Sequence, residues 1–130
     1  MKKSKGDPLH ITTEAVVATY TSASTIFQGL LKEVRELSRK KPDATMSPAK
    51  VKLINRVLTD LLGFLKPEPE GKYLEELDNE TLPQVSDALL VMVQFDTALS
   101  KFKSRYQTYD SMTRVHSWVT QESLAPKQGK

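Results

Sequence analysis

Apolar residues recur at intervals of three and four along three stretches of the chain, which is the spacing of one buried face of an α-helix. The first stretch carries the stripe Val16, Tyr20, Ala23, Phe27, Leu30, Val34 and Leu37. Ile26 and Leu31 widen this stripe, and a wide stripe favours a helix bundle over the narrow seam of a two-stranded coiled coil. We therefore predict a long helix over residues 12–40.

The second stripe has a distinct start and end. Ser47 is a good N-cap residue, and Pro48 stands at the first helical position, where its missing N–H is not needed. The apolar positions that follow are Val51, Ile54, Leu58, Leu61 and Leu65. Pro67 disfavours helical angles at the residue before it, so the second predicted helix covers residues 47–66.

The third stripe begins after Thr81 and Gln84, whose spacing is typical of a capping box. Its apolar positions are Val85, Ala88, Met92, Phe95, Leu99, Phe102, Tyr106 and Tyr109. This stripe predicts a helix over residues 82–108. Beyond it the apolar frame slips, and we interpret residues 110–122 as a C-terminal helical extension. We favour a break or bend near Asp110, and the pattern leaves open whether the extension is a separate helix.

The predicted fold is all-α, since few segments alternate with the period of a strand and no Asn-Gly or Asp-Gly hairpin signal occurs. It is an up-down bundle of three long helices, about 12–40, 47–66 and 82–108, with a short helix in the acidic 67–80 loop and the C-terminal extension. We expect a single domain over residues 11–122, between a flexible basic tail at 1–10 and a flexible tail at 123–130.

Composition narrows the class of protein. The chain has 130 residues, 38% of them hydrophobic and 27% charged, which suits one domain with a modest core. It has no cysteine, which excludes disulfides and thiolate-bound zinc. The longest apolar run, residues 88–93, is far shorter than the roughly 20 residues of a membrane span. We expect a cytoplasmic protein without membrane contact.

The sequence contains no pattern that indicates catalysis. The glycine patterns of phosphate-binding loops are missing from it. His10 and His116 are its two histidines, and neither has a second histidine three or four residues away, as a helical metal site would need. Glu33 and Glu36 stand among lysines and arginines and are expected to be ion-paired. We therefore predict no enzyme, no metal and no cofactor.

The distribution of charge is more informative than the total of +3. Residues 32–56 hold eight basic and three acidic residues, whereas residues 67–80 hold six acidic residues and one lysine. In an up-down-up bundle the third helix returns to the basic turn, so we predict a positive pole around residues 39–50 and a negative pole at 67–80. The candidate residues for binding an anion or a partner are Arg35, Arg39, Lys40, Lys41, Lys50, Lys52, Lys101, Lys103 and Arg105.

These features favour a non-enzymatic interaction module, such as an adaptor, an assembly subunit or a regulatory subunit. It would bind another protein or a second copy of itself through helix packing and its opposite charged poles. Tyr109 and Trp118 are the candidate interface anchors. The alternative is a small RNA- or nucleic-acid-binding subunit that uses the positive pole, with Tyr106 and Tyr109 placed to stack on bases.

Overall fold

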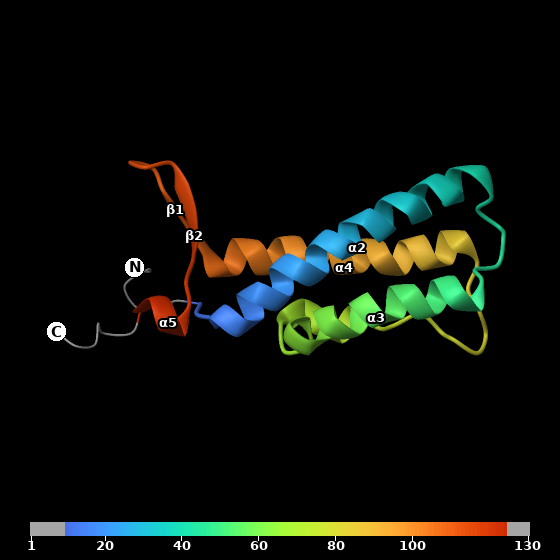
Figure 1. Ribbon diagram of the computed structural model, residues 1–130, viewed down its shortest axis with the longest axis horizontal. Coiled ribbons are helices and arrows are strands. Elements are labelled where there is room, and N and C mark those ends of the chain that lie inside the picture. The colour runs from blue at the N-terminus through green and yellow to red at the C-terminus, as the bar shows by residue number, and fades with distance from the viewer. Residues whose placement is uncertain (1–9, 125–130) are drawn as a thin grey trace.

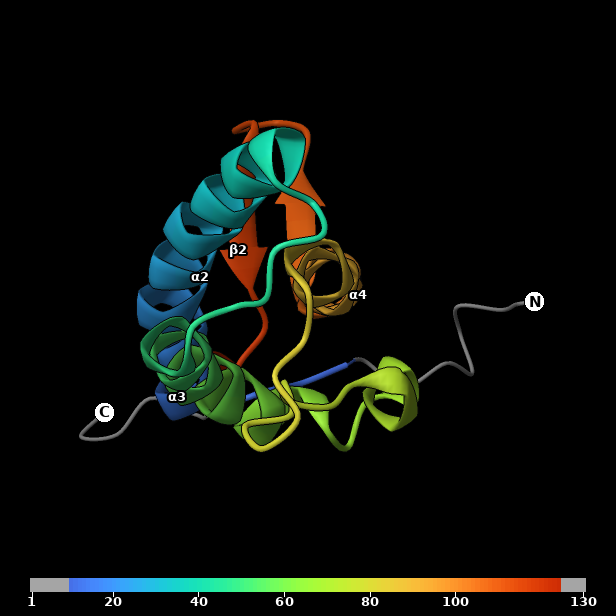
Figure 2. The ribbon, with the colours of Figure 1, turned by 90° about the vertical axis from the view of Figure 1, so that its right-hand side faces the viewer.

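The computed structural model describes residues 10–124, in which three long helices pack along one another (Figure 1). They are α2 (Glu14–Lys40), α3 (Pro48–Leu65) and α4 (Val85–Tyr106). Seen along the bundle, the three helices occupy the corners of a triangle (Figure 2). The three helices predicted from the stripes are confirmed, with small differences at their ends.

The start of α3 follows the predicted cap. The Ser47 hydroxyl accepts a hydrogen bond from the Lys50 N–H at 3.2 Å, and Pro48 begins the helix. The predicted capping box before α4 is wrong, because Gln84 is the N-cap and makes no side-chain cap hydrogen bond. Gln84 is instead part of a short antiparallel bridge with Thr45.

The direction of α4 corrects the predicted up-down-up topology. After α3 the chain makes a 3₁₀ turn, η1 (Pro69–Tyr73), and a return segment, residues 74–84, then runs back beside the bundle to the α2–α3 loop. There the Met46 N–H donates to the Pro83 carbonyl and the Val85 N–H donates to the Ala44 carbonyl, both at 2.8 Å. Helix α4 therefore starts at this loop and runs parallel to α3.

An extended return is physically sufficient for this topology. A strand-like segment advances about 3.3 Å per residue against about 1.5 Å in a helix, so a short segment spans the whole of α3. Leu74 and Leu77 anchor the return segment because their side chains are buried in the core. The acidic 67–80 stretch is therefore drawn out along the bundle and does not form a negative pole.

The core is formed where the three helices meet. Its largest fully buried side chains include Phe27, Leu31, Met46, Leu58, Leu61, Met92, Phe95 and Phe102. An aromatic cluster closes the end where α4 finishes. In that cluster Phe102 packs against Phe64 and Tyr106, with ring centroids 5.0 and 4.6 Å apart.

A β-hairpin replaces the predicted C-terminal helical extension, which is wrong. Strands β1 (Gln107–Asp110) and β2 (Val115–Trp118) pair antiparallel and project from the end of α4 (Figure 1). Tyr109 and Val115 belong to residue types that favour strands. The turn reaches a positive φ of 61° at Arg114 without a glycine, so the usual hairpin signal is missing from the sequence.

The two ends of the described chain meet beside this hairpin. The Thr12 N–H donates to the Val119 carbonyl at 3.0 Å, and the Thr12 carbonyl accepts from the Gln121 N–H at 2.9 Å. A short helix, α5 (Gln121–Leu124), follows. Residues 1–9 and 125–130, which hold most of the two predicted tails, lie outside the described residues.

Candidate partner-binding groove

A groove runs along the face shared by α2 and α3. The two helices diverge towards the loop that joins them (Figures 1 and 2), and three adjoining hollows of about 330, 870 and 340 Å³ lie in line between them. Neighbouring hollows share lining residues, so they form one continuous channel. We call this channel the α2–α3 groove. Its lining includes Val16, Thr19, Ser22, Ile26, Leu30, Glu33, Leu37, Lys40, Lys50, Leu53, Arg56, Val57, Asp60 and Gly63.

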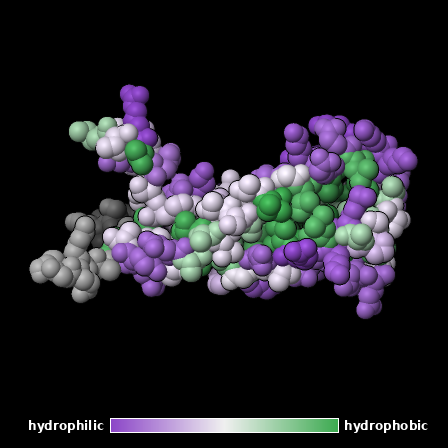
Figure 3. Space-filling model, viewed as in Figure 1, coloured by the Kyte–Doolittle hydropathy of each residue, from purple (hydrophilic) through white to green (hydrophobic). Residues whose placement is uncertain are grey.

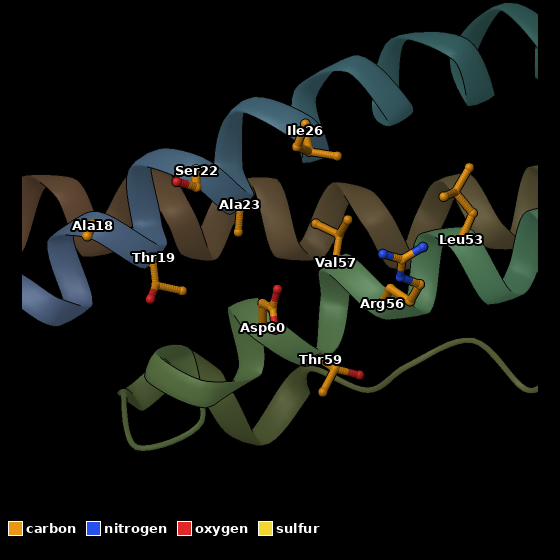
Figure 4. Close-up of a pocket in the computed structure, with 10 residues that line it drawn as sticks. All are labelled: Ala18, Thr19, Ser22, Ala23, Ile26, Leu53, Arg56, Val57, Thr59 and Asp60. Carbon is orange, nitrogen blue, oxygen red and sulfur yellow. The ribbon is translucent and has the colours of Figure 1, made fainter.

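The middle of the groove is apolar and open. Ile26 of α2 is 56% exposed and Leu53 of α3 is 47% exposed, and their side chains project into the space between the helices together with Val57 (Figure 4). Figure 3 shows a hydrophobic patch over this face. Contiguous exposed apolar surface of this kind marks an interaction site on a folded protein.

The half of the groove that lies away from the α2–α3 loop is lined by small side chains. Ala15, Ala18 and Ser22 face it from α2, and Gly63 faces it from α3. A Cβ atom added at Gly63 would meet no other atom within 4 Å. This half therefore has room for the backbone of another helix at the close end of the usual 8–10 Å packing distance.

Charged residues line the rims and ends of the groove. Lys40 and Lys50 lie at the end next to the α2–α3 loop, and Asp60 lies towards the other end beside Thr19 and Thr59. Glu33 lines the α2 rim and Arg56 lines the α3 rim. The groove therefore combines an apolar centre with a polar margin, which is the usual anatomy of a protein interface.

The predicted cation cluster is divided between two ends of the molecule. The candidates from α2 and α3, which are Arg35, Arg39, Lys40, Lys41, Lys50 and Lys52, lie exposed at or near the end with the α2–α3 loop. Lys101, Lys103 and Arg105 lie in the last turns of α4, at the opposite end. Their predicted convergence is wrong, because α4 runs away from the α2–α3 loop.

Arg105 also forms ion pairs within the protein. Its guanidinium pairs with Glu68 at 2.8 Å and with Glu70 at 3.0 Å, and its side chain is only 19% exposed. The Tyr106 hydroxyl donates to Glu68 at 2.9 Å. The Arg105 hydrogen bond holds the pKa of Glu70 below its ordinary value. These contacts tie η1 to the end of α4.

The two predicted interface anchors have different surroundings. Trp118 is half-buried, and its ring lies 4.9 Å from that of Tyr20 and 6.1 Å from that of Phe102. Tyr109 is 54% exposed on the hairpin, with its ring 4.8 Å from that of His116. Trp118 therefore joins the hairpin to the core, while Tyr109 faces solvent.

The groove was not predicted from the sequence, although one signal for it was present. Ile26 stands outside the main stripe of its helix, and Leu53 and Val57 form a second apolar line on theirs, four residues apart. Second lines of this kind indicate an additional helix contact. The main stripes face the core and account for the predicted bundle alone.

Metal and membrane sites find no support in the described part of the chain. Within residues 10–124, no three histidine, cysteine, aspartate or glutamate side chains gather closely enough to hold a metal ion. None of the helices in that range has the length and apolarity that crossing a bilayer requires.

Comparisons with known protein families, curated proteins and solved structures find no match for this chain.

Proposed function

We propose that the protein is a helix-binding interaction module whose α2–α3 groove receives one amphipathic helix of a partner protein. The observation that supports this role is the exposure of Ile26 and Leu53 towards a continuous groove between two helices. A fourth helix in this position would convert the three-helix bundle into a four-helix bundle. The proposed role is non-enzymatic and needs no cofactor.

The dimensions of the groove suit a helix of moderate length. Its lining reaches from Ala15 to Lys40 on α2, and at about 1.5 Å per residue this is a span of roughly 35 Å. A helix of about 20 residues covers most of that span. Its apolar residues would recur at i, i+3 or i+4, and i+7, as in other helix-in-groove complexes.

The separation of the candidate cations supports this role over the nucleic-acid alternative. Lys101 and Lys103 lie at the end of the bundle opposite Lys50 and Lys52, so a bound strand would not meet both groups on one short surface. The apolar groove offers no row of stacking aromatic rings among its lining residues, whereas single-strand binding usually combines such rings with cations.

A designed peptide tests the helix-binding role. The probe is a fluorescently labelled amphipathic helix of about 20 residues with a leucine stripe and a neutral polar face. We expect it to bind the protein, and we expect Ile26→Asp/Leu53→Asp to weaken binding at least about tenfold, because two carboxylates would be buried under an apolar stripe. Fluorescence anisotropy measures both affinities.

Leu90→Asp is the matched control. Leu90 is 62% exposed on α4 and does not line the groove, so its substitution adds a carboxylate at an equally accessible apolar position elsewhere. We expect this variant to bind the peptide as the unchanged protein does. Equal binding to all three proteins, or no binding to any of them, would contradict the proposed role.

A further inference from the structure

The ends of the α2–α3 groove carry opposite charges, and this bears on which helix fits it. Lys40, in the last turn of α2, and Lys50, in the first turn of α3, both line the end next to the α2–α3 loop. Asp60 lines the groove towards the other end. Within residues 10–124 none of these three side chains forms a salt bridge. Asp60 is the one charged residue among those that line the outer hollow at its end of the groove.

Lys50 is the more informative of the two lysines. A cation at the end of a helix is stabilised by that helix's own dipole, which explains Lys40 without reference to a ligand. A cation in the first turn of a helix opposes the dipole, and α3 has no acidic residue in its first turn to balance Lys50. An anionic group in the groove would provide that balance.

Other charged groups reduce the charge at both ends of the groove without cancelling it. Glu33 lines the same hollow as Lys40 and Lys50, and Arg56 lines a hollow with Asp60, one helical turn away from it. Glu36, the other acidic residue near the lysine end, forms a salt bridge with Arg39. The ends of the groove therefore determine the electrostatic preference for one direction of a bound helix.

Resting on the proposed function, we infer that the bound helix lies parallel to α2, with an acidic C-terminal turn between Lys40 and Lys50 and its N-terminus beside Asp60. In this direction the negative end of the helix dipole meets the two lysines, and the positive end meets Asp60. Acidic side chains in the last turn add direct ion pairs with the lysines. The opposite direction would place both ends of the dipole beside like charges.

Two labelled peptides of identical composition and opposite charge order test this inference. Both carry the leucine stripe; the C-acidic peptide has lysines in its first turn and glutamates in its last turn, and the N-acidic peptide has the reverse. We expect the C-acidic peptide to bind about tenfold more tightly at low salt, with the difference shrinking as salt screens the charges.

Charge reversal in the protein provides the decisive comparison. Lys40→Glu/Lys50→Glu is expected to reverse the order of the two peptide affinities. The control Lys32→Glu/Lys52→Glu makes the same change in net charge at exposed positions of the same two helices that do not line the groove. We expect the control to preserve the order.

A nitroxide at the C-terminus of the C-acidic peptide reports its direction. We expect it to broaden the amide NMR signals of Ala44 and Thr45, in the α2–α3 loop, and to leave those of Gly63 sharp. Broadening at Gly63 instead would overturn the inferred direction.

The remaining outcomes separate the inference from the proposed function. If both peptides bind equally and Ile26→Asp/Leu53→Asp weakens both, the charge preference is wrong and the helix-binding role stands. If neither peptide binds, the helix-binding role itself fails. A dimer that the same double substitution dissociates, and that excludes both peptides, would assign the groove to a second copy of the chain and overturn the inference.

Discussion

The side chain of Asn55 pairs with the backbone of Leu77 through two hydrogen bonds. Its amide nitrogen donates to the Leu77 carbonyl and its amide oxygen accepts from the Leu77 N–H, both at 2.9 Å. Asn55 lies in α3 and Leu77 lies in the return segment, so the asparagine provides the hydrogen bonds that a neighbouring strand would otherwise provide. This contact, together with burial of the Leu77 side chain, holds the return segment on α3.

Substitution of Asn55 tests how the return segment is held. We expect Asn55→Ala to lower the free energy of unfolding by roughly 1–3 kcal/mol, because both backbone groups of Leu77 lose their partner. Urea denaturation measures the change. Asn79→Ala is the control, since Asn79 is exposed in the same segment, and it should leave the midpoint nearly unchanged. Equal effects of the two substitutions would contradict the assigned role of Asn55.

The ion pairs of Arg105 predict how stability responds to acid. Because Arg105 lowers the pKa of Glu70 in the folded protein, the ionised carboxylate stabilises the fold at pH values above its ordinary pKa of 4.5. That stabilisation is lost as the pH falls from about 4.5 through the lowered pKa. Arg105→Met should therefore reduce stability at pH 7 by roughly 1–3 kcal/mol and flatten the decline below pH 4.5.

Urea denaturation at a series of pH values checks this prediction. Lys103→Met removes the same charge at an exposed position of the same helix and should retain the acid-dependent decline of the unchanged protein. An Arg105→Met protein whose stability declines with acid as steeply as that of the Lys103→Met protein would show that the ion pairs of Arg105 do not produce this dependence.

The helices could be predicted from the sequence because their signals are local. The stripe from Val51 to Leu65 and the Ser47-Pro48 cap act within a few residues of one another. The direction of α4 is not local in this sense, because it depends on where Leu74 and Leu77 are buried.

The hairpin was missed for a related reason. Tyr106 and Tyr109 continue the apolar spacing of α4, so the helical pattern extends past the residue where the helix ends. The turn reaches a positive φ at Arg114 without glycine. The groove was missed because exposure of Ile26 and Leu53 depends on how far α2 and α3 diverge, which the spacing of apolar residues does not specify.

The contacts of Trp118 predict a difference between the two candidate anchors. Trp118→Ala should lower the free energy of unfolding by about 3 kcal/mol, because the ring packs against Tyr20 and Phe102. Tyr109→Ala should change it by less than about 1 kcal/mol, since that ring is largely exposed. Thermal unfolding of the two variants measures the difference. A destabilising Tyr109→Ala beside a neutral Trp118→Ala would reverse the assignment.

Two glycines should respond to the same substitution in opposite directions. A Cβ at Gly29, in the middle of α2, would meet no atom within 4 Å, so Gly29→Ala should stabilise the protein by about 0.5–1 kcal/mol through the higher helix propensity of alanine. A Cβ at Gly71, in η1, would lie 2.2 Å from the Lys66 carbonyl oxygen. That contact requires the backbone to move, so Gly71→Ala should be destabilising and should loosen the turn that carries Glu70. Thermal unfolding gives the sign of both effects, and a stabilising Gly71→Ala would show that the chain does not approach so closely after α3.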